Sequence, residues 1–290
     1  SSPICESTSQ KNFRIIKDHS ISKEDFALVQ CDQCSFIYTN PRPTSEHLGK
    51  YYQSEEYISH HNRSNNLINI IYGIARRFTL RWKSGIVHRY SKPDTILDIG
   101  CGTGHFLQYL KKRQWSILGV EPDTTARQQA LSILGNDLVL QSLKQVPESR
   151  TFQIISLWHV LEHVDDLNSY FNRIKQLLNK NGRIIIAVPN YNSYDAEHYD
   201  TYWAGYDVPR HFYHFSQKTV ALLAKKHNLK IENTIPMKLD AYYVSLLSEK
   251  YKNSGLVGYL KSVITAYKSN RYARKHDLDY SSLIFVMKRQ

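Results

Sequence analysis

One stretch decides the fold of this chain: Ile96-Leu97-Asp98-Ile99-Gly100-Cys101-Gly102-Thr103-Gly104-His105-Phe106. Its first residues form a short apolar run, which is typical of a buried strand. Three glycines then stand at alternate positions, and glycine lets the backbone turn sharply and approach a ligand closely. The helix expected next would point its N–H groups at the same place. A strand, a glycine loop and a helix in this order predict a ligand site at the end of the strand.

The spacing of these glycines excludes a dinucleotide site. The dinucleotide pattern Gly-x-Gly-x-x-Gly would need a further glycine at His105 or Leu107. Asp98, at the end of the strand, suits an ammonium group better than a pyrophosphate. Glu121 ends the next apolar run, where an acid holds a ribose diol. The expected ligand therefore has an amino-acid group and a ribose but no phosphates, and S-adenosylmethionine is such a ligand.

Strand and helix patterns alternate from Thr95 onward, which is typical of βαβ units in a parallel sheet. We therefore expect an α/β fold with a Rossmann-like, mostly parallel seven-stranded sheet and helices on both faces. A small N-terminal β/helical appendage and a helical insertion before the last strand complete it. The expected strands of the sheet span 95–99, 116–120, 138–140, 154–158, 183–188, 231–235 and 282–288.

The same patterns divide the chain into three parts. Residues 1–62 form an N-terminal segment that contains cysteines, and residues 63–92 form a basic amphipathic helix. Residues 93–290 form the core, with a lid loop at 191–215 and the helical insertion at 240–276. The apolar positions that predict the amphipathic helix are Leu67, Ile70, Ile71, Ile74 and Phe78.

The residues around the glycine loop resemble the first motifs of class I S-adenosylmethionine-dependent methyltransferases, over roughly residues 94–235. The resemblance implies that Asp98 and the glycines contact the methionine portion of the cofactor and that Glu121 binds the ribose hydroxyls. The family's adenine-binding acid is missing, so Ser142 or backbone atoms would serve there. The expected cofactor-binding residues are Asp98, Gly100, Cys101, Gly102, Gly104, Phe106, Glu121, Pro122, Ser142, Leu143, Trp158 and His159.

The segment Trp158-His159-Val160-Leu161-Glu162-His163 is similar to the Leu-Glu-His motif that follows the fourth strand in this family. His163 is a candidate general base, because imidazole titrates near neutral pH. In the alternative interpretation, Glu162 and His163 only fix the start of a helix.

The segment 191–215 is rich in aromatic residues and histidines, and it follows the fifth strand at the edge where open α/β sheets bind ligands. It predicts a substrate lid with Arg210 as an anion clamp, or else a satellite core in which the rings merely pack. The candidate catalytic residues are His163, His211 and Tyr206. The candidate substrate-binding residues are Tyr202, Trp203, Arg210, Tyr213 and His214.

The cysteines extend the resemblance to a subfamily with an N-terminal cysteine segment, whose members often carry two Cys-x-x-Cys pairs that make a zinc knuckle. Cys31 and Cys34 match the second pair, while the first is expected at Cys5, with Thr8 where a ligand is wanted. Structural zinc needs four ligands. We therefore expect a degenerate knuckle without metal. If zinc did bind, Cys5, Cys31 and Cys34 would be its candidates, completed by His19 or a water.

The net charge of +12 is concentrated in two segments. Residues 57–93 hold seven Lys and Arg without an acid, and residues 244–276 hold seven against Glu249 alone. Such tracts favour an anionic partner or are solvated helix faces. The expected acceptor is a small molecule, anionic or carrier-linked. Membrane-surface contact stays an alternative, because residues 66–82 and 256–271 are basic and amphipathic.

Other classes receive less support from the sequence. A nucleic-acid acceptor is disfavoured because no nucleic-acid-binding module is recognisable. A protein that binds S-adenosylmethionine without catalysis stays an alternative, and the oligomeric state is open. The absence of a long apolar run and of a signal-like start predicts a cytoplasmic protein.

Overall fold

The computed structural model describes residues 1–44, 46–52 and 66–290, and the side chains of all of these except 66–76. The chain divides into two compact units. Unit 1 comprises residues 1–57, 159–168 and 187–285. Unit 2 comprises residues 58–158, 169–186 and 286–290.

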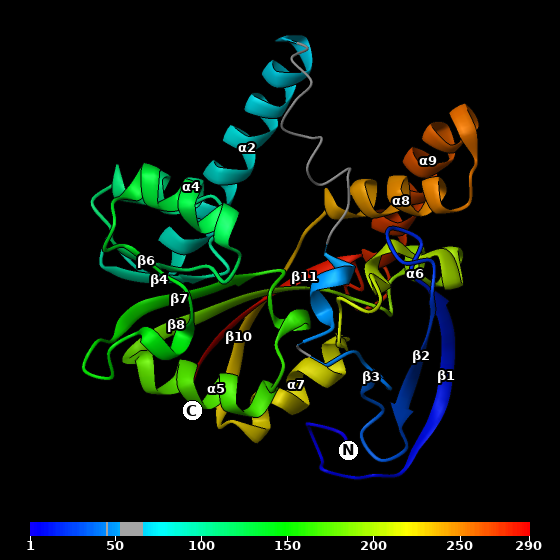
Figure 1. The fold of residues 1–290 in the computed structure, drawn as a ribbon, viewed down its shortest axis with the longest axis horizontal. Coiled ribbons are helices and arrows are strands. Elements are labelled where there is room, and N and C mark those ends of the chain that lie inside the picture. Colours follow the sequence, from blue (N-terminus) through cyan, green and yellow to red (C-terminus); the bar gives the residue numbers. More distant parts are fainter. Residues whose placement is uncertain (45, 53–65) are drawn as a thin grey trace. The chain divides into compact units, whose positions relative to one another are not determined.

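A seven-stranded sheet confirms the predicted Rossmann-like α/β class (Figure 1). β4 pairs in parallel with β5 on one side and with β7 on the other, and β5 pairs in parallel with β6. The strand order therefore reverses beside β4, and the carboxyl end of β4 lies at the point where open α/β sheets bind ligands. The strands, in spatial order, are β10 (Leu229–Pro236), β11 (Ser282–Arg289), β8 (Leu178–Pro189), β7 (Phe152–Trp158), β4 (Thr95–Ile99), β5 (Ser116–Val120) and β6 (Val139–Leu140).

Helices of unit 2 follow its strands. β4 and β7 are buried apolar runs, so both faces of the sheet need cover there. The start of α4 is fixed by Asp123, whose carboxylate accepts a hydrogen bond from Ala126 N at 2.7 Å. The helices here are α2 (Asn66–Tyr90), α3 (His105–Lys111), α4 (Thr124–Leu134), α5 (Leu167–Leu177) and the short η2 (Leu143–Gln145).

Unit 1 holds a second, four-stranded antiparallel sheet in the order β1 (Gln10–Lys17), β2 (Asp25–Cys31), β3 (Ile37–Thr39) and β9 (Tyr213–His214). β9 belongs to the segment that the sequence predicts to be a lid. Tyr38 of β3 pairs with Tyr213 of β9. The N-terminal strands and the segment 191–215 therefore form one sheet.

The segment 191–215 is folded rather than open. It contains α6 (Tyr194–Tyr199), the 3-10 turns η4 (Asp200–Tyr202) and η5 (Ala204–Tyr206), and β9. Asp195 of α6 is fully buried and accepts hydrogen bonds from Trp203 Nε1 at 2.8 Å and from the hydroxyls of Ser269 and Ser281 at 2.7 Å each. This one carboxylate joins α6 to the residue that follows η4, to α9 and to the residue that precedes β11.

The remaining elements of unit 1 are η1 (Leu48–Tyr51), η3 (Leu161–His163), α7 (Gln217–Lys226), α8 (Asp240–Tyr251) and α9 (Gly255–Ala273). α8 and α9 lie side by side (Figure 1) and occupy the region where the sequence predicts a helical insertion. Within the described parts of the chain, no helix has the length and apolar character needed to cross a bilayer.

Candidate active site

The glycine loop of unit 2 has the backbone conformation that its three glycines predict. Gly100, Gly102 and Gly104 all have positive φ, of 72°, 54° and 80°. A Cβ on Gly104 would lie 3.0 Å from Leu134 Cδ1, so this glycine lets α3 pack against α4. A Cβ on Gly102 would meet no atom within 4 Å, which leaves open space beside the loop. Gly104 thus allows two helices to pack closely, whereas Gly102 faces open space that a ligand can enter.

Asp98 is buried at the end of β4. It is 2% exposed, and its Oδ1 accepts a hydrogen bond from Ser156 Oγ at 2.6 Å. Burial raises the pKa of this carboxyl to about 6, although the Ser156 bond and the charge of Lys83 lower it. A buried carboxylate with one hydrogen bond can still receive an ammonium group, whose charge would favour the ionised form.

Glu121 is held from both sides at the end of β5. Its Oε2 accepts a hydrogen bond from Gly102 N at 2.8 Å, and its Oε1 accepts one from Asp123 N at 2.9 Å. Each oxygen has a second lone pair. The carboxylate is therefore oriented in advance, with acceptor capacity left for two hydroxyls of a ribose.

The loop expected at the adenine end is closed by a residue that the sequence analysis did not single out. Gln145 turns back, and its side-chain oxygen accepts hydrogen bonds from Gln141 N at 2.9 Å and Ser142 N at 3.2 Å. Leu143 is buried, and Pro122 is exposed. Gln145 therefore orients the loop, and Ser142 keeps its position as the expected polar residue of this end.

Trp158 and Phe106 come together at the end of β7. Their rings meet edge to face with centroids 5.8 Å apart. Lys83 of α2 lies with its Nζ 4.5 Å from the Trp158 ring centroid, and its charge lowers the pKa of Asp98. Lys83 is the clearest functional candidate that sequence reasoning missed. In the sequence, Lys83 is one of several basic residues of a predicted helix, and the pattern does not indicate which of them faces the core.

Cys101 packs rather than reacts. Burial raises the pKa of its thiol far above the usual range. A Cβ on Gly119 would lie 2.7 Å from Cys101 Sγ, so the neighbouring strand needs glycine there. The side chain of Cys101 thus fixes the distance between the loop and β5.

A charged cluster in unit 1 follows directly after Trp158 in the chain. Glu162 is fully buried, and neither of its carboxylate oxygens accepts a hydrogen bond among the described residues. Its Oε1 lies 3.4 Å from His159 Nδ1, while His159 Nε2 lies 3.0 Å from Asp240 Oδ2. Burial opposes both charges. The two carboxylates nevertheless raise the pKa of His159 to about 9, and His159 with its neighbours lowers the pKa of Glu162 to about 2.

Two further histidines complete this cluster. His163 Nδ1 lies 2.9 Å from the Arg210 carbonyl oxygen, and His211 Nδ1 lies 3.0 Å from that of Gly205. Carbonyl oxygens only accept, so each ring carries a hydrogen on Nδ1, and in the neutral form of the ring the lone pair lies on Nε2. The rings meet at 79° with centroids 4.7 Å apart. One ligand atom of each histidine and one Glu162 oxygen all lie within 4.8 Å of one another.

The prediction for Arg210 needs correction. Its guanidinium is 8% exposed and bonds Asp207 Oδ1 at 2.7 Å, Asp18 Oδ1 at 3.0 Å and the Tyr51 carbonyl at 2.9 Å. Asp18 is itself fully buried, and Arg210 holds its pKa well below the usual range although burial opposes this. The donors of Arg210 are thus turned inward, where they neutralise two carboxylates, and we no longer assign it to an acceptor anion.

The aromatic residues of this segment mostly form a core. Trp203 and Tyr206 are 2% and 1% exposed and pack with Ile16, Leu28 and Ile37 of the N-terminal strands. The Tyr206 hydroxyl accepts a hydrogen bond from Arg14 Nη1 at 2.7 Å, and burial raises its pKa to about 12.

The outer members of the segment differ in exposure. Tyr202 is 39% exposed and stacks on His19. Tyr213 donates to the Asp165 carbonyl at 2.8 Å. His214 Nε2 lies 3.2 Å from Thr39 Oγ1, and burial lowers its pKa to about 3. Most of the expected substrate-binding residues are therefore engaged within unit 1, and Tyr202 is the one most open to solvent.

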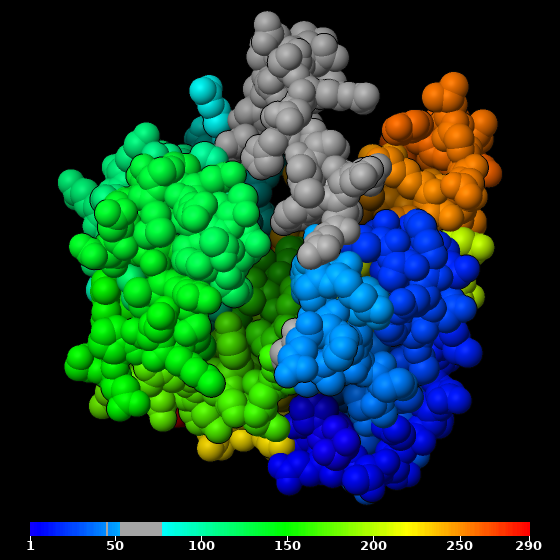
Figure 2. Space-filling view, viewed as in Figure 1, coloured from blue at the N-terminus to red at the C-terminus, as the bar shows by residue number. Residues whose placement is uncertain are grey.

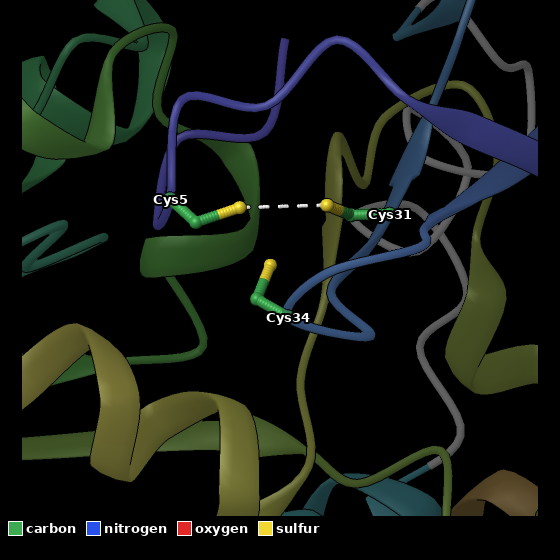
Figure 3. Close-up of side chains that lie close together, drawn as sticks. All are labelled: Cys5, Cys31 and Cys34. Atoms are coloured by element: carbon green, nitrogen blue, oxygen red, sulfur yellow. Dashed lines mark hydrogen bonds between the residues drawn. The ribbon is translucent and has the colours of Figure 1, made fainter.

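Three cysteines converge at the N-terminal end of unit 1 (Figure 3). One sulfur from each of Cys5, Cys31 and Cys34 lies within 4.8 Å of the other two, with Cys5 and Cys31 at 3.5 Å. The Ser2 hydroxyl lies 3.2 Å from Cys34 Sγ. Three thiols and a hydroxyl in one cluster fit the donor number of a tetrahedral metal site. His19, the donor expected from sequence, instead stacks between Tyr202 and Tyr251.

Comparisons with known proteins agree with the fold. The family model described as "Methyltransferase domain" matches residues 74–234. The ubiquinone biosynthesis O-methyltransferase of Pelagibacter ubique is 27% identical over 188 residues, which cover 58% of this chain and 74% of that protein.

Two further matches cover a shorter part of the chain or have lower sequence identity. The ubiquinone biosynthesis O-methyltransferase of Rhodopseudomonas palustris strain HaA2 is 28% identical over 102 residues, so this chain spans about 40% of its length. A crystal structure of 1,6-didemethyltoxoflavin-N1-methyltransferase from Burkholderia thailandensis superimposes with a TM-score of 0.52. It is 14% identical, and the match covers 91% of this chain and 96% of that one, which supports the fold alone.

Proposed function

This chain belongs to the methyltransferase-domain family, and from that premise we propose that it transfers a methyl group from S-adenosylmethionine to a hydroxyl oxygen of a small-molecule acceptor. The cofactor supplies an electrophilic methyl group, and most of the catalysis of such a displacement comes from alignment. The chain's own residues have two tasks: they hold the donor, and they remove a proton from the acceptor.

Three features of unit 2 support the binding of this donor. The Asp98 carboxylate is buried and accepts a hydrogen bond from the Ser156 hydroxyl on Oδ1, and a carboxylate of this kind suits an ammonium group. Glu121 is oriented by two backbone N–H groups and keeps acceptor capacity for a diol. The space beside Gly102 admits a ligand close to the backbone. These are the residues we assign to the methionine and ribose portions.

The observation that carries the catalytic proposal is the environment of Glu162. This carboxylate is fully buried without a hydrogen bond among the described residues, and it stands beside the imidazoles of His159, His163 and His211. Burial of an ionised carboxylate is costly unless a positive charge compensates it. Protonation of a neighbouring imidazole supplies such a charge. Glu162 helps to raise the pKa of His159 to about 9, and it opposes the fall that burial causes in the pKa of His211.

The proton then has a defined route. The acceptor hydroxyl gives its proton to His163 Nε2 as its oxygen forms the new bond to the methyl carbon. The bond between that carbon and the sulfur breaks, and its electron pair stays on the sulfur. The imidazolium is stabilised by Glu162, and Nδ1 keeps its hydrogen on the Arg210 carbonyl. We choose His163 over His211 because His163 is partly exposed, whereas burial lowers the pKa of His211 to about 4.

Separate observations bear on the class of the acceptor. Oxygen as the methylated atom is supported by the presence of a base and by similarity to proteins named O-methyltransferases. With Arg210 turned inward, the anionic or carrier-linked character of the acceptor rests only on the two basic tracts of the sequence.

The test uses the full chain with radiolabelled S-adenosylmethionine and a small-molecule extract, and products are separated by liquid chromatography. We expect labelled products whose formation falls about 10² to 10⁴-fold in Glu162→Gln and His163→Ala, the usual range for loss of a general base. Affinity for S-adenosylmethionine, measured by calorimetry, should change less than twofold in both.

The matched control is Glu249→Gln, since Glu249 is another buried carboxylate of unit 1 with an oxygen that accepts no hydrogen bond among the described residues. It should keep full activity per folded protein. A wild-type chain that binds the cofactor and labels nothing would support the binding protein without catalysis. Equal rates in Glu162→Gln and wild type would remove the proton route proposed here.

A further inference from the structure

Two turns of unit 1 share one backbone geometry. In the first, Glu6 N donates to the Ser2 carbonyl at 2.9 Å, and Glu6 has a φ of 65°. In the second, Ser35 N donates to the Cys31 carbonyl at 3.0 Å, and Ser35 has a φ of 63°. In each turn, the first residue and the residue three positions later both belong to the cluster. These residues are Ser2 and Cys5 in the first turn, and Cys31 and Cys34 in the second.

This equivalence corrects the register expected from sequence. The first pair is Ser2-Pro3-Ile4-Cys5, and not Cys5 to Thr8, so Ser2 stands where the second turn has Cys31. Ser2 is fully buried, and its hydroxyl lies 3.2 Å from Cys34 Sγ. The fourth donor is therefore present in the cluster, as a hydroxyl in place of a thiol.

We propose that Cys5, Cys31 and Cys34 bind a Zn²⁺ ion as thiolates and that the Ser2 hydroxyl completes the tetrahedron. A neutral hydroxyl is a weaker ligand for zinc than a thiolate, so this site holds its metal less tightly than four cysteines would. Bound zinc would fasten the N-terminal turn to the turn between β2 and β3. Each thiol loses its proton to solvent as the metal binds.

The experiment titrates the reduced, metal-free full chain with Co²⁺ alone, followed by displacement with Zn²⁺. We expect one equivalent of Co²⁺ to give thiolate-to-cobalt charge-transfer absorption and the strong visible bands of four-coordination. Ser2→Cys should tighten Zn²⁺ binding at least tenfold in chelator competition, and Ser2→Ala should weaken it several-fold. Cys34→Ser should lose the signal, while Cys101→Ser, a buried cysteine of unit 2, should leave it unchanged.

Three outcomes would overturn this assignment. The first is absence of the cobalt signal in the wild type. The second is equal Zn²⁺ affinity in the wild type, Ser2→Cys and Ser2→Ala. The third is a native mass two hydrogens lighter than the sequence, together with peptide mapping that places the disulfide between Cys5 and Cys31. Circular dichroism of each variant confirms folding, and none of these readouts depends on methyl transfer.

An independent observation concerns α9, whose two faces are reversed compared with an ordinary surface helix. Its inner face carries small or polar residues, namely Gly258, Ser262, Thr265, Ala266, Ser269, Asn270 and Ala273. Its outer face carries large apolar residues that are 44–87% exposed, namely Leu256, Leu260, Val263, Ile264 and Tyr267. These outer positions are spaced i, i+4, i+7, i+8 and i+11, so they share one stripe.

Positive charge lies beside this stripe and beyond its C-terminal end. Lys261, Lys268 and Arg271 of α9 and the following Arg274 and Lys275 are all exposed, and residues 255–275 contain no acid. Figure 2 shows the α9 surface, in orange, open to solvent in that view. A contiguous apolar stripe bordered by cations is the pattern of a helix that lies in a membrane interface.

We infer that α9 docks onto an anionic lipid bilayer, with its outer stripe in the headgroup region and its cations on the lipid phosphates. Charge favours this occupant over a second copy of the chain, because a symmetric contact through the stripe would bring the same cations together. The inference needs neither the zinc site nor the proposed reaction.

Flotation with vesicles of phosphatidylcholine, with or without phosphatidylglycerol, tests it. The full chain should float with the anionic vesicles at low salt, at least tenfold more than with neutral ones, and less at high salt. Leu256→Glu/Leu260→Glu should reduce flotation at least tenfold. The control is Ile15→Glu, which changes an apolar residue of β1 that is 67% exposed, and it should float like the wild type.

Flotation that is absent, or equal in the double variant and the wild type, would overturn this docking. Light scattering tests the alternative, in which the stripe contacts a second copy of the chain. A wild-type dimer that becomes a monomer in the double variant, without vesicle binding, would assign the stripe to a second copy of the chain instead.

Discussion

The glycine loop and the segment 191–215 both drew attention in the sequence, yet only the first has the structure that its pattern predicts. Gly100, Gly102 and Gly104 each adopt the positive φ that the alternating glycines require. In the second, Arg210 is predicted to meet a ligand but instead contacts Asp18, 192 residues earlier in the chain.

The difference lies in the range of the interactions that decide each region. A glycine loop is fixed by conformations available to single residues and by the strand before it. The role of an arginine or tyrosine depends on which distant strand packs against it, and composition does not reveal this. Aromatic density predicts burial as readily as it predicts binding.

The largest expected effect comes from Arg210→Met. If Arg210 is an internal counter-ion, its loss leaves Asp18 and Asp207 as buried carboxylates without their cation, and unfolding free energy should fall by about 3–5 kcal/mol. Urea unfolding monitored by tryptophan fluorescence measures this. Arg113→Met, at an exposed position just after α3, is the control and should cost less than about 0.5 kcal/mol. Unchanged stability with weaker acceptor binding would restore the anion clamp.

A smaller effect is expected at the glycine loop. Asp98→Asn keeps the shape of the side chain but removes the charge that would face the ammonium group of S-adenosylmethionine. The dissociation constant should rise roughly 100-fold, or about 3 kcal/mol for a charge-assisted hydrogen bond. Calorimetry measures it, with the exposed Asp137→Asn as control. A change below threefold would mean that Asp98 does not hold the ammonium group.

The pH dependence of cofactor binding is a second test of whether Asp98 holds the ammonium group. Burial raises the pKa of Asp98 to about 6, against the opposing effects of Ser156 and Lys83 and with the help of Glu121. The ionised form binds the ammonium group, so affinity should fall as pH drops through this value. Between pH 7.5 and pH 5 we expect about a tenfold loss, because roughly a tenth of the carboxyl groups stay ionised at pH 5. Asp98→Asn should show no such dependence.

The extent to which sequence predicts this molecule follows the same division. The strands at 95–99 and 116–120 agree with the structure, because a buried parallel strand is a short apolar run with clear ends. Lys83 and Gln145 were missed, since neither belongs to a local motif. Ser2 was missed because serine is not expected among metal ligands, and only the repeated turn geometry reveals its equivalence to Cys31.

The smallest expected effect separates packing from catalysis at Tyr206. The sequence predicts a side chain near the reacting atom, but the hydroxyl is buried and accepts a hydrogen bond from Arg14. Tyr206→Phe removes that acceptor while the ring keeps its place beside Trp203, so stability should fall by about 1 kcal/mol. Since Arg14 also bonds Asp200 at 3.1 Å, its charge keeps a partner.

The methyl-transfer rate of folded Tyr206→Phe should stay within about twofold of wild type if the hydroxyl only packs. A catalytic hydroxyl would lose 10² or more in rate at nearly unchanged stability. Thermal unfolding and single-turnover rates on the same preparation therefore give opposite results for the two roles. With the burial of Trp203 and Tyr206 beside Ile16 and Leu28, packing is the role that the structure supports.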